Sequence, residues 1–300
     1  MQARSRFPWL YLVLAYGLAW LFWIPAALTG KDYQSSPLLL AVVLVGVFGP
    51  GLAGIILTYR QGDLEERGAF WRRMLDLRRI RPIWYALIVL FWPAMQFLAL
   101  LLNQTLGGAS PDFKFIGELA ARPLGIPVVI ALYFLQAGLE ELGWRGYMLE
   151  KILPGWGKLR SSLIIGLFHT FWHLPLFWVV GTNQIKIGLG TGLLFFAAQA
   201  IAFSIYATWC YAANDHSTLA VTLFHTVGNL CVDGFALEPG SVRSAIYTML
   251  MVLGALAIGA AWLDRGGARK SEQAVGPQGG LGTSRIDSAA LGSGLPRTTG

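Results

Sequence analysis

Long apolar runs recur along most of the 300-residue chain. A helix of about 20 apolar residues crosses the roughly 30 Å of hydrocarbon in a bilayer. Eight runs approach or exceed this length, and they lie at residues 9–28, 38–58, 82–102, 124–149, 163–180, 191–212, 218–232 and 245–263. The seventh is short and carries polar residues. The pattern predicts an all-α, polytopic integral membrane protein with about eight transmembrane helices.

The composition points to the same class of protein. Hydrophobic residues make up 55% of the chain and charged residues 13%, whereas a soluble globular domain has about 25% charged residues. A soluble protein is therefore excluded. The many Trp and Phe side chains are expected at the membrane interfaces and against lipid.

Lys and Arg are concentrated in alternate connections between the runs. With the N-terminus placed inside, fifteen of them lie in inside segments and five in outside loops. Basic residues beside short loops resist translocation, so both termini are predicted to be cytoplasmic, most simply in the plasma membrane. The net charge of +7 reflects this asymmetry and favours an attraction to anionic lipid. No ordered basic domain is evident, so nucleic acid is not an expected partner.

Four parts are expected along the chain. Residues 1–123 hold the first three runs and, at 59–82, an arginine-rich cytoplasmic connection with the spacing of an interfacial amphipathic helix. Residues 124–232 hold the polar residues described next, and 233–265 hold the last helix. Residues 266–300 are rich in Gly, Ser, Thr and Pro and are predicted to be a disordered tail.

Ionisable side chains interrupt the fourth run. Glu140, Glu141 and Arg145 lie within the apolar stretch LYFLQAGLEELGWRGYMLE. An ionisable residue at membrane depth costs at least about 2.5 to 3.5 kcal/mol and therefore needs a partner. Glu141 and Arg145 are four residues apart on one helical face and are predicted to pair. Glu140 points about 100° away from Glu141, so it requires a different partner.

Later runs supply candidate partners for Glu140. His169 and His173 are four residues apart, as are His225 and Asn229, so each pair shares one face of its helix. Both faces can look toward Glu140, which predicts a polar cavity within the membrane. Polar side chains also hold transmembrane helices together, at about 0.6 kcal/mol per bond, and this role stays open for the glutamate–arginine pair. An extra carboxylate beside two imidazoles is better explained by a functional site.

The same residues carry a resemblance to a known family. The chain resembles the CAAX protease and bacteriocin-processing (CPBP, or Abi) family of intramembrane proteases over residues 124–232. The family has three motifs, and the matching residues occur in family order: Glu140, Glu141 and Arg145 for the first, His173 for the second, His225 and Asn229 for the third. The second motif normally has an aromatic residue four positions before its histidine. Here His169 occupies that position, which puts the motif's packing role in doubt and adds a candidate metal ligand.

The resemblance implies an intramembrane endopeptidase. Peptide hydrolysis needs a base that activates water and donors that hold the oxyanion. Glu140 is the candidate base, and His173 could bind the same water. His225 and Asn229 are candidate oxyanion donors, and the resemblance implies the same assignment. It also implies that the site is shaped by Glu141 and Arg145.

Zinc is the alternative to a glutamate acting alone, because zinc usually takes three protein ligands and a water. His173, His225 and His169 are the candidate ligands. The His-Glu-x-x-His signature is absent, so a metal-independent mechanism is favoured and no cofactor is assigned. Without a metal, replacing His169 is expected to matter much less than replacing His173 or His225.

Two other classes of function stay open. A proton-coupled transporter would also bury Glu and His, but it would place them along both halves of the fold, often with repeat symmetry. Here they lie in the second half, and no repeat is evident. A non-catalytic immunity or scaffold protein of the same fold is the other alternative. The expected partners are the lipid bilayer and a membrane-associated peptide or protein, whether prenylated or exported.

Overall fold

The computed structural model describes residues 7–274 of the chain, with side chains up to residue 263. One unit holds Met1–Trp262 and a second holds Leu263–Gly300, and the architecture below is that of the first. The described residues form helices and no strand. The α-helices are α1 (Trp9–Leu28), α2 (Pro37–Gly46), α3 (Gly49–Gln61), α4 (Leu64–Leu75), α5 (Pro82–Thr105), α6 (Lys114–Ala121), α7 (Ile126–Gly143), α8 (Glu150–Trp172), α9 (Asn183–Ile187), α10 (Thr191–Ala213), α11 (Thr218–Gly234) and α12 (Val242–Ala274).

The helices confirm a polytopic, all-α membrane protein. Within residues 7–274, five stretches are long and apolar enough to cross a membrane, or six if the bent pair α2 and α3 forms one span. The fourth and fifth predicted runs lie in one continuous stretch, Pro123–Trp178. The seventh run forms α11, whose 17 residues lie at the short limit of about 17 for a span. Each of the eight runs therefore corresponds to helical structure.

Local sequence signals explain where several helices begin and bend. Ser36, Asp63 and Ser217 accept hydrogen bonds from backbone N–H groups in the first turns of α2, α4 and α11, as N-cap residues do. Helices α2 and α3 meet at an angle of 46°. In α8, Gly157 has a φ of +71°, a conformation that favours glycine. The helix is broken there, and its second segment leads to the histidines.

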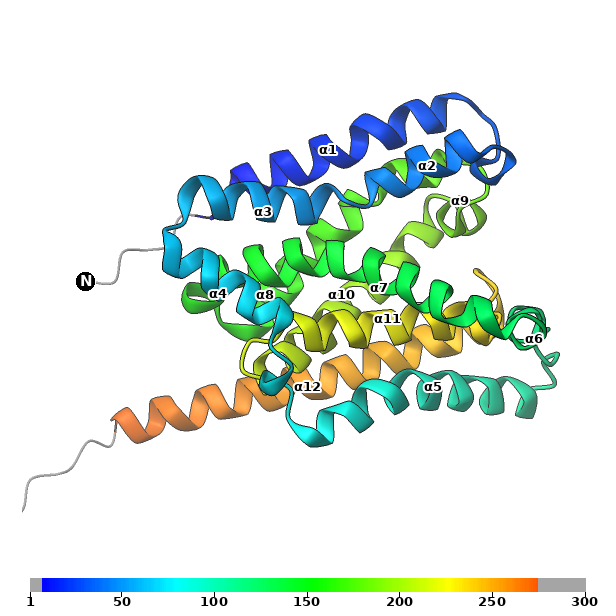
Figure 1. The fold of residues 1–300 in the computed structure, drawn as a ribbon. Coiled ribbons are helices and arrows are strands. Elements are labelled where there is room, and N and C mark those ends of the chain that lie inside the picture. Colours follow the sequence, from blue (N-terminus) through cyan, green and yellow to red (C-terminus); the bar gives the residue numbers. More distant parts are fainter. Residues whose placement is uncertain (1–6, 275–300) are drawn as a thin grey trace, which may run out of the picture. The chain divides into compact units, whose positions relative to one another are not determined.

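Helix α7 lies between α3 and α11 (Figure 1). It packs against α3 on one side and α11 on the other, while α10 packs against α8 and α11. Glycines allow the α3–α7 approach: a Cβ on Gly143 would lie 2.3 Å from the Pro50 carbonyl oxygen, and one on Gly51 would lie 2.4 Å from the Leu139 carbonyl oxygen. Small residues bring membrane helices into close contact in this way. The C-terminal half of α7 is thereby enclosed by protein.

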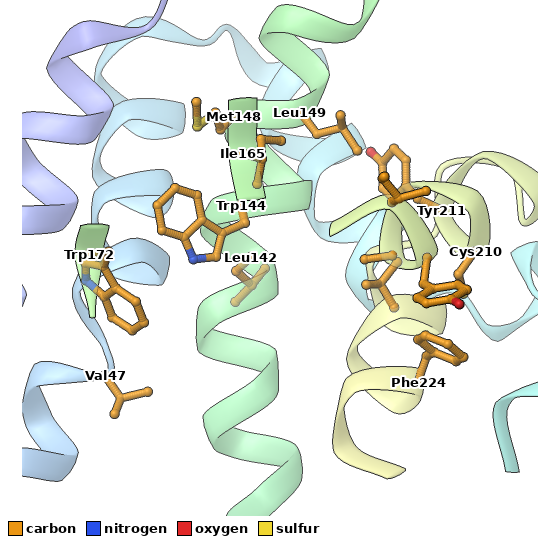
Figure 2. Packing of buried hydrophobic residues seen from close by; sticks show 14 of the residues in the cluster. Val47, Leu142, Trp144, Met148, Leu149, Ile165, Trp172, Cys210, Tyr211 and Phe224 are labelled. Atoms are coloured by element: carbon orange, nitrogen blue, oxygen red, sulfur yellow. The ribbon is translucent and has the colours of Figure 1, made fainter. Parts of the chain in front are cut away.

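Tryptophan side chains fill the core around this part of α7. Trp23, Trp92, Trp144 and Trp172 are among the largest fully buried side chains, and Figure 2 shows Trp144 and Trp172 lying between neighbouring helices. The expectation that tryptophans lie at the interfaces and against lipid is wrong for these four. Trp23 and Trp144 pack against Trp172, and Trp144 and Trp172 contact His169 and His173. Trp92 packs against Phe203, Tyr206 and Phe224.

Helix boundaries and packing add detail to two further expectations. The connection at 59–82 contains an amphipathic helix, α4, whose side chains Phe70 and Met74 are buried in the protein core. Helix α12 ends at Ala274, within the predicted tail. The rest of that predicted tail, 275–300, lies outside the described residues.

Candidate active site

Helix α7 carries two carboxylates close to its end and continues into a π-helical turn, η4 (Trp144–Leu149). Glu140 and Glu141 are 3% and 0% exposed, and Arg145, in the π turn, is 0% exposed. Such turns inside longer helices are frequent at functional sites. The sequence alone gave no indication of this turn.

Glu141 accepts hydrogen bonds from two side chains. Arg145 Nη1 lies 3.0 Å from Glu141 Oε2, and His225 Nδ1, on α11, lies 2.9 Å from Glu141 Oε1. The predicted ion pair is therefore present, and its carboxylate also orients His225. In its neutral form His225 donates Nδ1–H to Glu141, which leaves Nε2 as an acceptor. His225 can donate a second hydrogen bond only as an imidazolium.

Of the candidate partners, His169 is the one that contacts Glu140. His169 Nε2, on α8, lies 3.1 Å from Glu140 Oε2, and both side chains are buried. The His169 ring also stacks on Trp144 at 5.3 Å between centroids, with an interplanar angle of 28°. His169 thus keeps the packing role of an aromatic residue and adds a hydrogen bond to the carboxylate.

His173 lies one turn beyond His169, just after α8 ends. Its Nδ1 lies 3.2 Å from the His169 carbonyl oxygen, so Nδ1–H donates there and Nε2 is left as an acceptor. Its ring packs against Trp172 and Phe196. No hydrogen bond joins it to Glu140 within the described part of the chain.

The candidate catalytic residues share one cavity of about 870 Å³. Its wall includes Glu140, His173, His225 and Asn229, together with His169. Glu141 and Arg145 are fully buried behind this wall. The cavity contains the chemistry that hydrolysis needs: a carboxylate, imidazole acceptors and an amide donor.

Sequence reasoning missed several residues of the same cavity. Gln136 precedes Glu140 by four positions and Asp233 follows Asn229 by four, so the helical spacing could have found both. Tyr133 donates a hydrogen bond to Asp233. Phe203 packs its ring 4.6 Å from His225, and no sequence signal marks it.

The three candidate zinc ligands do not form a metal site. Among the residues that the structure describes, no three His, Cys, Asp or Glu side chains could hold a metal ion together. His169 Nε2 is directed at Glu140 and His225 Nδ1 at Glu141, while His173 Nδ1 binds a carbonyl. This arrangement therefore does not support a metalloprotease.

Comparisons with known proteins agree with the geometry. Residues 122–231 match a family model described as type II CAAX prenyl endopeptidase Rce1-like. A protein of Methanococcus maripaludis described as CAAX prenyl protease 2 is 28% identical over 226 residues, which cover 74% of this chain and 83% of the relative. The segment matched by the family model contains all the residues of the three motifs.

Proposed function

Because the chain belongs to the CAAX protease and bacteriocin-processing family and is a multi-pass membrane protease, we propose that Glu140 activates the water that hydrolyses a peptide bond of its substrate. One observation supports this above the others: Glu140 lies in the same cavity as His173, His225 and Asn229. The proposed base, a second group that can bind the water, and the oxyanion donors therefore line the same cavity.

Glu140 is suited to accept a proton from water. His169 binds one of its oxygens, Oε2, and no further hydrogen bond to this carboxylate is found among the described residues. Oε1 can therefore accept the proton while the water oxygen bonds to the carbonyl carbon. His173, with Nε2 as an acceptor, can bind the water's second hydrogen. When the C–N bond breaks, Glu140 returns its proton to the leaving amine.

The negative charge that develops on the carbonyl oxygen needs donors. The Asn229 side chain can supply an amide N–H. His225 can supply a second donor as an imidazolium, oriented by Glu141, which lies 2.9 Å from its Nδ1. Arg145 in turn holds Glu141. The ion pair therefore acts on the reaction through His225.

The test is Glu140→Gln, which keeps the side chain's volume but removes its ability to take a proton. The purified variant in lipid should bind peptides of a membrane-anchored library, while cleavage followed by mass spectrometry should fall by about 10² to 10⁴. Glu118→Gln makes the same chemical change at an exposed position on α6, and it should cleave like the parent. Parental rates in Glu140→Gln would overturn the mechanism.

We also propose that the reaction needs no metal ion. The mechanism above uses only side chains, so cleavage should survive a chelator, and metal analysis of the active preparation should find no stoichiometric zinc. Zinc present at one equivalent and lost on replacing His169 would contradict it. Both termini are proposed to face the cytoplasm, with the protein in the plasma membrane.

A further inference from the structure

A pocket formed mainly by arginine side chains, the arginine pocket, lies where η2 (Leu77–Arg79) connects α4 to α5. Its volume is about 490 Å³. The residues that line it are Asp76, Arg78, Arg79, Arg81, Ala213 and Asp215. None of these six lines the cavity that contains Glu140, and the proposed mechanism uses none of them. The arginine pocket is therefore a separate site whose chemistry needs its own explanation.

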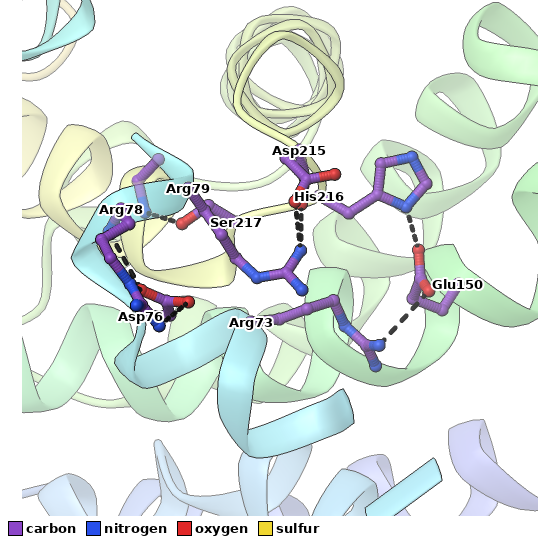
Figure 3. A network of polar contacts seen from close by, with 9 residues as sticks. Arg73, Asp76, Arg78, Arg79, Glu150, Asp215, His216 and Ser217 are labelled. Atoms are coloured by element: carbon purple, nitrogen blue, oxygen red, sulfur yellow. Dashed lines mark hydrogen bonds and ion pairs between the residues drawn. The ribbon is translucent and has the colours of Figure 1, made fainter. Parts of the chain in front are cut away.

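The two connections that form the arginine pocket are bonded to each other (Figure 3). Arg79 Nη1 lies 2.8 Å from Asp215 Oδ2 and also donates to the backbone carbonyl oxygen of Asp215. The Arg81 backbone N–H donates to Asn214 Oδ1 at 3.0 Å. Asp215 and His216 have φ values of +47° and +57°, which are uncommon for residues other than glycine. These bonds hold the α10–α11 connection in an unusual conformation against η2.

The α10–α11 connection is also held from α8 and α4. His216 Nδ1 lies 2.7 Å from a carboxylate oxygen of Glu150, and Arg73 Nη1 lies 3.5 Å from the other oxygen of the same carboxylate. Figure 3 shows these side chains next to the pair of Arg79 and Asp215. Because four elements are joined here, the arginine pocket is a fixed part of the fold.

The arginine pocket has an excess of positive charge and keeps donors for a ligand. Its lining carries three guanidinium groups and two carboxylates. Arg78 donates to Asp76 through Nε at 2.9 Å and Nη2 at 3.2 Å, which orients the guanidinium and leaves Nη1. Among the described residues, no hydrogen bond involves the Arg81 side chain, and Arg79 donates through Nη1 alone. A guanidinium presents five N–H donors in a fork that matches the oxygens of a phosphate group.

The arginine pocket lies at the start of a membrane span. Helix α5 begins at Pro82, directly after Arg81, and is long and apolar enough to cross a membrane. At 1.5 Å per residue its length is about 36 Å, more than the roughly 30 Å of hydrocarbon. The first turn of α5 is therefore expected at the level of the lipid headgroups. Leu75, Leu77 and Ile83, on either side in the sequence, are exposed apolar side chains that lipid can cover.

We propose that Arg78, Arg79 and Arg81 bind a phosphate group, and that an anionic phospholipid supplies it. Such a headgroup neutralises the excess positive charge, while its acyl chains lie against the exposed apolar side chains beside the pocket. A zwitterionic lipid carries its own cation next to the phosphate and should bind more weakly. The connection at 59–82 is predicted to be cytoplasmic, and the cytoplasmic leaflet is the one rich in anionic lipid. The proposal does not depend on the mechanism of cleavage.

Lipid binding to the purified full-length protein tests the site. Native mass spectrometry in detergent should show that phosphatidylglycerol binds at lower concentration than phosphatidylcholine. Arg81→Gln should weaken phosphatidylglycerol binding by about 10-fold, because charge-assisted hydrogen bonds to phosphate are strong. The thermal midpoint without lipid should stay at the parental value, since the Arg81 side chain has no hydrogen bond to lose among the described residues.

The matched control is Arg72→Gln, which makes the same chemical change at an exposed position on α4 outside the arginine pocket. It should bind phosphatidylglycerol like the parent. Equal weakening by Arg72→Gln and Arg81→Gln would show that the lipid responds to diffuse charge, which would overturn the site. Equal binding of phosphatidylglycerol and phosphatidylcholine would also overturn it.

Competition with inorganic phosphate identifies the source of the phosphate group. At constant ionic strength, millimolar phosphate should displace little of the bound phosphatidylglycerol, because free phosphate has no acyl chains to cover the apolar side chains. Full displacement by phosphate, lost in Arg81→Gln, would keep the anion site and overturn the lipid as its ligand.

Discussion

His169 combines two roles that sequence reasoning kept apart. Its position in the second motif predicts an aromatic packing residue, and its chemistry suggested a metal ligand. In the structure its ring stacks on Trp144 while Nε2 contacts Glu140. Because His169 contacts the proposed base, we now expect its replacement to reduce activity even in a metal-independent enzyme.

Replacing His169 with Phe separates these roles. His169→Phe keeps a ring beside Trp144 but removes the hydrogen bond to Glu140. A hydrogen bond to a charged group contributes about 1.5 to 3 kcal/mol, so kcat/KM should fall by about 10- to 100-fold. The thermal midpoint should stay close to that of the parent. Unchanged kcat/KM would show that Glu140 does not need this partner.

Arg145 is predicted to contribute to the stability of the fold in the first place and to catalysis in the second. Arg145→Ala leaves the fully buried Glu141 without its cation, and breaking one side of a buried pair costs about 3 to 5 kcal/mol. Folded yield and thermal midpoint in detergent should drop. Lys151→Ala is the matched control, because its pair with Glu66 is largely exposed and is worth about 1 kcal/mol or less. Equal effects of the two variants would contradict the assigned role.

At the scale of helices, the sequence predicted where the helices lie better than it predicted which side chains contact one another across them. Apolar length alone identified the runs, and four-residue spacing placed Glu141 beside Arg145 and predicted a shared face for His225 and Asn229. Which histidine meets Glu140 depends on how α8 is rotated against α7. That rotation follows from packing, including the break at Gly157 and the rings of buried tryptophans, and no local pattern encodes it. The bend between α2 and α3, by contrast, has a local signal, because Pro50 lies in the first turn of α3 and a proline ends the helix before it.

The close approach of α3 and α7 gives a prediction at this scale. In Gly143→Ala the added Cβ would lie 2.3 Å from the Pro50 carbonyl oxygen, so the end of α7 must shift. Overpacking of this kind costs about 1 to 3 kcal/mol. Both the thermal midpoint and the cleavage rate should fall, since Glu140 and Glu141 lie on the preceding turn. Gly117→Ala on α6 is the control, because nothing lies within 4 Å of its added Cβ. If both variants resemble the parent, α3 and α7 are not packed as described.

At the scale of the whole molecule, the arginine residues and the connections that border the cavity lie at opposite ends. The carboxylates lie toward the arginine-rich end of α7, yet the cavity that contains Glu140 is bordered by connections at the other end. The network of Arg73, Glu150 and His216 lies at the arginine-rich end, and none of these three residues lines the cavity.

Reporter fusions test the proposed topology. With eight spans and a cytoplasmic N-terminus, a reporter fused after Gly266 lies in the cytoplasm, and one inserted at Gly107 lies outside, because three spans precede Gly107 and all eight precede Gly266. Gly107 is exposed and follows α5, so an insertion there should not disturb the bundle. A reporter active only in the cytoplasm should respond at the first site and not at the second, and one active only after export should do the reverse. The same response at both sites would contradict the topology and, with it, the proposed depth of Glu140 in the membrane.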